Sequence, residues 1–130
     1  MNDKIPTHEL ISKYNKLYLQ IKPVFSPAIN ELVYFNNSGF HHLVYKRGHR
    51  RAIGEISCRL ALVPLIVPVI RNCAEEVEIR IRKENIKGER IRVTYYALEA
   101  NVGRSNARVR VVTRKVGEKG KHYFQSIMKY

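Results

Sequence analysis

The amino-acid sequence predicts an α+β fold, in which N-terminal helices pack on a C-terminal antiparallel β-sheet of about four strands. Apolar residues recur at helical spacing in residues 1–72, whereas apolar and charged residues alternate in residues 73–130. The length of 130 residues fits one domain with a core of its own. We therefore expect a single domain over residues 1–130, mainly helical in its first part and an antiparallel sheet in its second.

The first half divides into predicted helices separated by breaks. Residues 7–25 place apolar side chains at helical spacing. Residues 26–34 begin with Ser-Pro, a cap followed by proline at the first helical position, which predicts a short second helix. The Asn-Asn-Ser-Gly run at residues 36–39 predicts a turn. Residues 51–72 are again helical in pattern, and Pro64 is expected to break or restart that helix.

Four runs with a period of two predict the strands of the second half. They lie near residues 77–82, 90–95, 108–112 and 122–128, and glycine- or asparagine-containing segments separate them. The connections are short, and a parallel crossover needs about a dozen residues or more. We therefore expect antiparallel hairpins.

The last two strands bring reactive side chains together. On a regular last strand, His122, Phe124, Ser126 and Met128 share one face. If the turn at residues 117–120 closes a hairpin, His122 and Ser126 lie within one strand width of the stretch from Arg110 to Arg114. The register stays open, because a slip of one residue would turn the arginines to the opposite face.

The charge of the chain indicates a polyanionic partner. The sequence has 24 Lys and Arg against 11 Asp and Glu, a formal net charge of +13. Such a field attracts polyanions, of which nucleic acid is the commonest. An anionic membrane surface and an acidic protein are the alternatives.

Several classes of protein are excluded by what the sequence lacks. The longest apolar run, residues 60–70, contains two prolines and is too short for a membrane span of about 20 residues. No apolar leader is visible at the N-terminus, and the two cysteines form no CxxC pair, so we expect a soluble protein of a reducing, cytoplasmic compartment. The scattered carboxylates do not predict a two-metal nuclease, and no P-loop or GxSxG motif occurs.

A basic segment at residues 39–51 carries three histidines. Its cations are expected to keep the imidazoles of His41 and His42 neutral and available as bases. A metal site is the competing interpretation, but no carboxylate or cysteine lies at ligand spacing, so we predict no metal. RNA cleavage needs none, because the 2′-OH is an internal nucleophile that a base, an acid and cations can activate.

Several segments together resemble a known family of ribonucleases. They are Gly39–Leu43 (GFHHL), Arg50-Arg51 with Arg59-Leu60, Tyr95–Leu98 (YYAL), and Val109–Val112 (VRVV) leading to His122–Ser126 (HYFQS). This set resembles the phage-associated branch of the barnase–EndoU–colicin–RelE (BECR) superfamily. The resemblance implies helices on a four-stranded antiparallel sheet whose open face cleaves RNA without metal. It also implies toxins that act on tRNA or mRNA and are restrained by an acidic partner.

We therefore predict a metal-independent endoribonuclease of toxin type that needs no cofactor and leaves a 2′,3′-cyclic phosphate. His122 is the expected acid or base, with His41 or His42 as its counterpart. Arg110, with Arg59 or Arg114, would stabilise the phosphorane. Ser126 would position a phosphate oxygen, and Tyr96 would stack on a base or share in proton transfer. The expected RNA contacts are Lys46, Arg47, Arg50, Arg51, Arg108, Arg114 and Lys121.

Two alternatives use the same charge without catalysis. The first is an RNA- or DNA-binding domain whose strand aromatics, Tyr95, Tyr96, Tyr123 and Phe124, stack on unpaired bases. The second is a protein-interaction module whose charge matches an acidic partner. An acidic antitoxin or immunity protein is also the partner that we expect for the enzyme.

Overall fold

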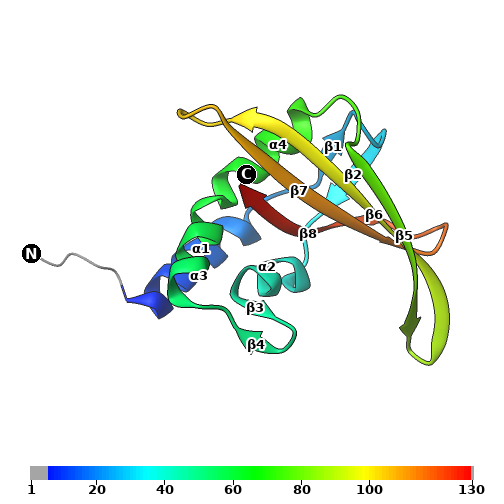
Figure 1. The fold of residues 1–130 in the computed structure, drawn as a ribbon, viewed down its shortest axis with the longest axis horizontal. Helices are drawn as coiled ribbons and strands as arrows, with labels where there is room; N and C mark the ends of the chain where they lie inside the picture. The colour runs from blue at the N-terminus through cyan, green and yellow to red at the C-terminus, as the bar shows by residue number, and fades with distance from the viewer. Residues whose placement is uncertain (1–5, 130) are drawn as a thin grey trace, which may run out of the picture.

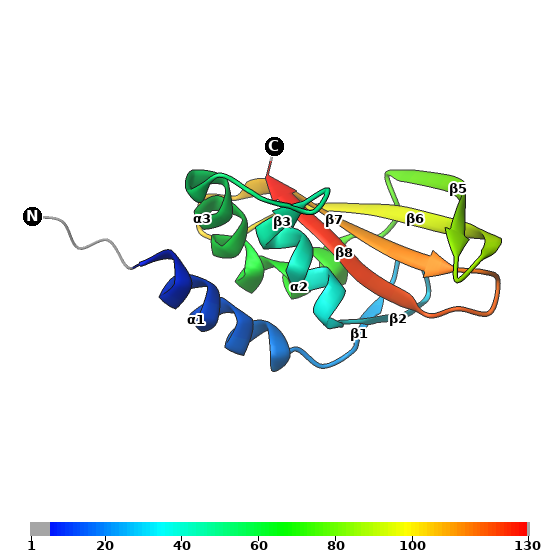
Figure 2. The ribbon, with the colours of Figure 1, turned by 90° about the horizontal axis from the view of Figure 1, so that it is seen from below.

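The computed structural model describes residues 6–129 and confirms the α+β class, with helices on one face of a six-stranded sheet (Figures 1 and 2). The helical elements are α1 (Thr7–Leu19), α2 (Asn37–Val44), α3 (Ile53–Ala61), a 3₁₀ turn (Val63–Leu65) and α4 (Ile66–Asn72). The strands of the large sheet are β1 (Val24–Ser26), β2 (Glu31–Tyr34), β5 (Glu78–Ile86), β6 (Glu89–Val102), β7 (Ala107–Val116) and β8 (His122–Lys129). A separate two-stranded ribbon consists of β3 (Tyr45–Lys46) and β4 (His49–Arg50).

The four predicted C-terminal strands are present as antiparallel hairpins, but the sheet is larger than predicted. Its order is β1-β2-β8-β7-β6-β5, and β2 pairs with β8 in parallel. Lys87-Gly88 forms the turn between β5 and β6, with positive φ at both residues. The two additional strands come from the half of the chain that the sequence predicted to be mainly helical.

The helix predicted for residues 26–34 is instead the β1–β2 hairpin. Ser26 does cap a turn, since its Oγ accepts a hydrogen bond from the Ile29 amide at 3.3 Å. Asn30 then adopts φ of 61° and ends the helical course after one turn. The following residues are extended in β2, and the fully buried Val33 pairs with the buried Val24 of β1. The predicted cap at Ser26 is confirmed, but the predicted helix is wrong, because residues 31–34 form a strand that buries Val33 in the core.

The turn predicted at residues 36–39 is the start of α2. Asn36 is the N-cap, and its Oδ1 accepts a hydrogen bond from the Gly39 amide at 3.1 Å. The backbone carbonyl of Asn36 also accepts a hydrogen bond from the Tyr18 hydroxyl at 2.7 Å, which ties α1 to the start of α2. Asparagine favours both turns and N-caps, so the sequence pattern could not separate them.

The helix predicted for residues 51–72 is confirmed, with its break at Pro64. In the described part of the chain, Ile53–Asn72 has the length and apolar composition of a membrane span. The chain bends there from α3 through the 3₁₀ turn into α4, however, and Ile56, Leu60, Ile66 and Ile70 are fully buried in the protein core. One side of this segment therefore contributes to the protein core.

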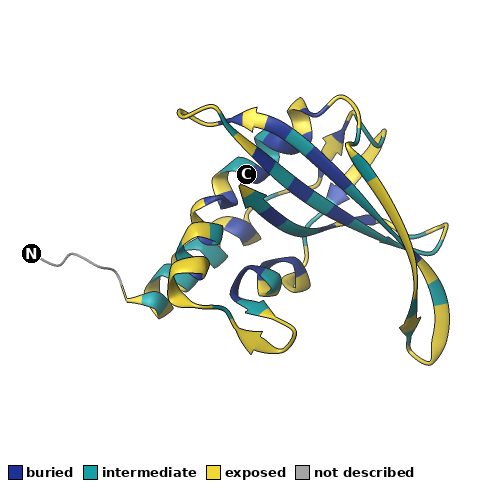
Figure 3. Cartoon of the chain, viewed as in Figure 1, coloured by how far each residue is buried: buried dark blue, intermediate teal, exposed yellow. Residues whose placement is uncertain are grey.

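One cluster of buried apolar side chains joins the helices to the sheet. It includes Leu43 of α2, Ile70 of α4, Leu98 of β6 and Ile127 of β8. Along β6 and β7, buried and less buried residues alternate (Figure 3), so one face of these strands belongs to the core. The opposite face, which we call the open face, carries no helix, and β5 forms its exposed edge (Figures 1 and 3).

Candidate functional site

A β-bulge in β8 determines which side chains share the open face. Val112 pairs with Ser126 and Thr113 pairs with Phe124, so Gln125 is an extra residue without a partner on β7. His122 and Phe124 therefore lie on the helix face, whereas Ser126 lies on the open face. The prediction that His122, Phe124, Ser126 and Met128 share one face is wrong for this reason.

His122 is buried on the helix face and is separated from the open-face arginines by the sheet. It is 1% exposed, and its Nε2 lies 2.9 Å from Glu31 Oε2 on β2. The ring of Tyr96 stands edge-on to the imidazole at 5.1 Å, also on the helix face. Both residues are thus separated from Arg110, and the predicted catalytic grouping of His122 and Tyr96 with Arg110 is wrong.

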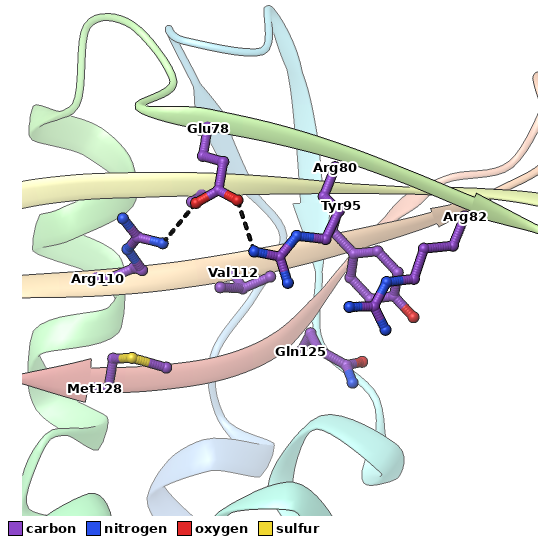
Figure 4. A pocket seen from close by; sticks show the side chains of 9 residues that line it. Glu78, Arg80, Arg82, Tyr95, Arg110, Val112, Gln125 and Met128 are labelled. Atoms are coloured by element: carbon purple, nitrogen blue, oxygen red, sulfur yellow. Dashed lines mark hydrogen bonds and ion pairs between the residues drawn. The ribbon is translucent and has the colours of Figure 1, made fainter.

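On the open face, arginines line a cavity of about 430 Å³ (Figure 4). Its walls are Glu78, Arg80, Arg82, Tyr95, Ala97, Arg110, Val112, Gln125 and Met128. Arg110 lies 2.7 Å from Glu99 and 3.2 Å from Glu78, which also pairs with Arg80 at 2.8 Å. Arg82 forms no ion pair with any residue in the range 6–129. The cavity therefore combines partly neutralised guanidinium groups with one that is available to an anion.

Beside this cavity, Glu84, Tyr95 and Arg114 form a hydrogen-bonded cluster, which we call the open-face triad. Arg114 Nη2 lies 3.0 Å from Glu84 Oε1, and its Nε donates to the Tyr95 hydroxyl at 3.3 Å. The Tyr95 hydroxyl in turn donates to Glu84. These contacts, Tyr95 first and then Arg114, hold the pKa of Glu84 below its usual range. Burial, together with the hydrogen bond to Glu84, raises the pKa of Tyr95, so its hydroxyl stays protonated.

His42 of α2 contacts the bulge residue Gln125, and the charge of Arg114 in the open-face triad acts on its imidazole. Its Nε2 lies 3.1 Å from the side-chain amide nitrogen of Gln125, and its backbone carbonyl accepts from Arg51 Nε at 3.0 Å. Burial lowers the pKa of His42, and the charges of His41, Arg51 and Arg114 lower it further. The imidazole is therefore neutral near pH 7, and its Nε2 accepts a hydrogen bond from the Gln125 amide, which leaves the ring proton on Nδ1.

Of the two adjacent histidines, only His42 faces the open-face residues. The ring of His41 is exposed and stacks on Tyr45, with centroids 4.4 Å apart and planes 10° from parallel. That pair borders a different cavity, between α1 and α2. The sequence left the choice between them open, and the packing of α2 places His42 against Gln125 of β8 and His41 against Tyr45.

The other predicted site residues are dispersed. Arg59 donates to the carbonyl of Ile127 at 3.0 Å, and Arg51, whose side chain is only 7% exposed, pairs with Glu55. Arg59 thus links α3 to β8, and Arg51 links α3 to α2 through the carbonyl of His42; neither lines the open-face cavity. Ser126 is half-buried on the open face, opposite Val112.

The predicted RNA contacts also separate into groups. Lys46, Arg47 and Arg50 are exposed on the β3–β4 ribbon. Arg108 pairs with Glu99 at 3.1 Å at the rim of the open face, and Lys121 lies over the ring of Tyr34 at 4.6 Å.

Sequence reasoning did not select Glu84, Arg80, Arg82 or Gln125. The alternation of β5 contained a usable signal, because Arg80, Arg82 and Glu84 are two residues apart and must share a face. Nothing in the sequence marked Gln125 as a bulge. Within residues 6–129, no group of three or more His, Cys, Asp or Glu side chains is placed to hold a metal ion.

Comparison with known proteins adds no identification: no family model, curated protein or solved structure matches the chain. The fold and the open face define a small, basic α+β protein with an arginine-rich sheet surface.

Proposed function

We propose that the protein is a metal-independent endoribonuclease whose active centre is the open-face triad with His42. The observation that carries the proposal is the contact between Tyr95 and Arg114 beside an arginine-lined cavity, with a neutral His42 near enough for the charge of Arg114 to lower its pKa. These are the groups that transfer of a phosphate to the 2′-OH requires. The resemblance to the BECR superfamily supports the same activity.

The proposed reaction assigns each group one task. The ribose 2′-OH replaces the Gln125 amide at His42 Nε2 and transfers its proton there, and the 2′-oxygen attacks the phosphorus. The bond from phosphorus to the 5′-oxygen breaks, and that oxygen receives the proton of the Tyr95 hydroxyl. Arg114 balances the negative charge of the phosphorane. The products are a 2′,3′-cyclic phosphate and a 5′-hydroxyl, and solvent returns a proton from the imidazolium to the phenolate.

This proposal keeps the predicted class of enzyme and changes its residues. His42 and Arg114 remain, Tyr95 replaces Tyr96, and His122 becomes a structural residue. The proposed setting is a cytoplasm, with tRNA or mRNA as substrate. A toxin of this kind would need an acidic inhibitor, and carboxylates on such a partner would complement Arg82 and Arg114.

The test is incubation with total RNA in excess EDTA. Wild-type protein is expected to cleave RNA and leave cyclic phosphate ends, and His42→Ala is expected to lower the rate by about 10²–10⁴-fold. Arg114→Ala should lower it similarly. His41→Ala is the matched control and should keep the activity, because its ring stacks on Tyr45 away from the triad. Intact tRNA, rRNA and mRNA pools after incubation with folded wild-type protein would contradict the proposal.

A second candidate is a nucleic-acid-binding protein without catalysis. The observation in its favour is that Arg80, Arg110 and Arg114 are each paired with a glutamate. These ion pairs hold the guanidinium groups in place, as a surface that only binds phosphates would also require. Such a protein would bind RNA without cutting it. Its affinity would fall in small steps as single arginines are replaced.

A further inference from the structure

One cross-strand row of the open face alternates aromatic and cationic side chains over five strands. The register pairs Tyr34 with Tyr123, Tyr123 with Arg114, Arg114 with Tyr95, and Tyr95 with Arg80. Directly paired residues point to the same face, so all five side chains belong to the open face. At about 4.8 Å per strand, the row is about 19 Å long.

The β2–β8 end of this row is an aromatic platform formed by the half-buried Tyr34 and the exposed Tyr123. The ring centroids lie 6.0 Å apart with planes tilted by 47°, and Tyr123 is 36% exposed. Lys121 Nζ lies 4.6 Å from the centroid of Tyr34. A cavity of about 310 Å³, lined among others by Tyr34, Lys119 and Lys121, adjoins the platform. Within residues 6–129, neither lysine forms an ion pair, so both ammonium groups are available to an anion.

The rest of the row leads from the platform to the open-face triad. Arg114, the next residue along from Tyr123, belongs to the triad and contacts Tyr95. A chain that carries a planar ring and a negative charge in every unit can therefore place a ring on Tyr123 and a phosphate near Arg114. Acidic peptides satisfy the cations but have no regular ring for the platform.

We propose that Tyr34 and Tyr123 form a stacking subsite for an unpaired base of a single-stranded nucleic acid, flanked by phosphate contacts to Lys121 and Arg114. The subsite rests on the proposed function in one respect: the bound nucleic-acid strand is expected to continue from Tyr123 to the open-face triad. Bases of a duplex are stacked on one another and cannot reach the rings, so the subsite selects single strands. Stacking on an aromatic side chain tolerates any base, so no sequence preference is expected from it.

The binding test uses a substrate that cannot be cleaved through a 2′-OH. A fluorescein-labelled single-stranded DNA of 12 nucleotides of mixed sequence, and the duplex made from it, are titrated with protein at fixed low salt. Tyr123→Ala and Tyr123→Leu are both expected to weaken single-strand binding about 10-fold and duplex binding less than 2-fold. Tyr123→Phe keeps the ring and should bind like wild type.

Two controls make the outcome decisive. The leucine variant keeps a bulky strand-forming side chain, and its fold is checked by circular dichroism. Phe25→Ala removes an exposed ring from the neighbouring strand β1 and should leave binding unchanged, since Phe25 lies outside the row. Unchanged single-strand affinity in Tyr123→Leu, or equal losses for single strand and duplex, would overturn the subsite.

The same proteins, assayed on total RNA, separate the two proposals. Ring-dependent binding without any cleavage would support the subsite and contradict the nuclease. Cleavage by wild type together with ring-independent binding would support the nuclease and contradict the subsite.

Discussion

At the scale of single residues, Gly39 has the most restrictive packing in α2. A Cβ at this position would lie 2.5 Å from the Tyr18 hydroxyl and 2.6 Å from the carbonyl oxygen of Phe124. The backbone of β8 cannot retreat without disturbing the sheet. The glycine thus allows α2 to lie directly against β8, which is the contact that delivers His42 to the bulge.

We expect Gly39→Ala to lower the free energy of unfolding by about 1–3 kcal/mol, because overpacking forces the helix away from the sheet. Gly54→Ala is the matched control, since a Cβ there meets no heavy atom within 4 Å. It should leave stability unchanged or raise it slightly. Urea unfolding followed by circular dichroism measures both, and equal stabilities for the two variants would disprove the close contact.

A second residue-scale prediction concerns acid stability. The hydrogen bond from Tyr95 and the charge of Arg114 lower the pKa of Glu84 in the folded protein. The unfolded chain therefore takes up a proton first as the pH falls, and the free energy of unfolding decreases from just above pH 4.5 downwards. Above that range the contribution of Glu84 is fully present.

The measurement is urea unfolding at a series of pH values between neutral and acid. Glu84→Gln should have a shallower acid limb than wild type. Glu118→Gln, at an exposed turn position without an ion pair among residues 6–129, should keep the wild-type limb. Identical limbs in wild type and Glu84→Gln would show that the triad does not hold the carboxylate in its ionised form.

At the scale of elements, the bulge divides β8 into two parts, and the alternation of buried and open-face residues is reversed between them. Before Gln125, the even-numbered residues His122 and Phe124 are buried, and after it the odd-numbered Ile127 is buried. A regular strand could bury only one of these parts. The bulge therefore satisfies the core at both ends of β8 and releases Gln125 to contact His42.

Deletion of Gln125 should remove the bulge and force one part of β8 to turn its apolar side chains to solvent. We expect a loss of stability of several kcal/mol, since Phe124 or Ile127 must leave the core. Gln125→Ala keeps the extra residue and should fold with little loss. Thermal unfolding compares them, and a deletion variant as stable as Gln125→Ala would contradict the register described above.

At the scale of the whole molecule, most of the net charge of +13 lies outside the open face. The open face carries five arginines, at positions 80, 82, 108, 110 and 114, against glutamates at 78, 84 and 99. The remaining excess is distributed over the ribbon, the helices and the turns. Only charges that meet phosphates contribute to the salt dependence of binding.

We expect the affinity for single-stranded oligonucleotide to fall with salt, with a slope of log K against log salt near −0.7 for each phosphate contact. Arg82→Ala should make that slope shallower by about 0.7, because Arg82 lines the cavity without an ion pair. Arg71→Ala removes an exposed charge of α4 outside that cavity and should leave the slope unchanged. If both substitutions changed the slope equally, the oligonucleotide would be bound by the net charge in general and not by specific phosphate contacts in the open-face cavity.

The sequence by itself determined the local structures whose signals lie close together in the chain. The helix predicted for residues 7–25 is present but ends at Leu19, and Val24–Ser26 is a strand. The break at Pro64 and the four alternating C-terminal strands with their turns are also present. Composition also determined that the surface is strongly basic. These features follow from side-chain spacing and turn chemistry, which depend only on residues close together in the sequence.

The tertiary structure decided which reactive side chains meet. The β1–β2 hairpin forms because Val33 is buried against the sheet, although Ser26 and Pro27 begin a helical turn. His122 is buried and Gln125 contacts His42 because one extra residue in β8 reverses the facing of that strand. A bulge changes no local composition and is stabilised by contacts between distant strands, so a period-two pattern alone could not place the site.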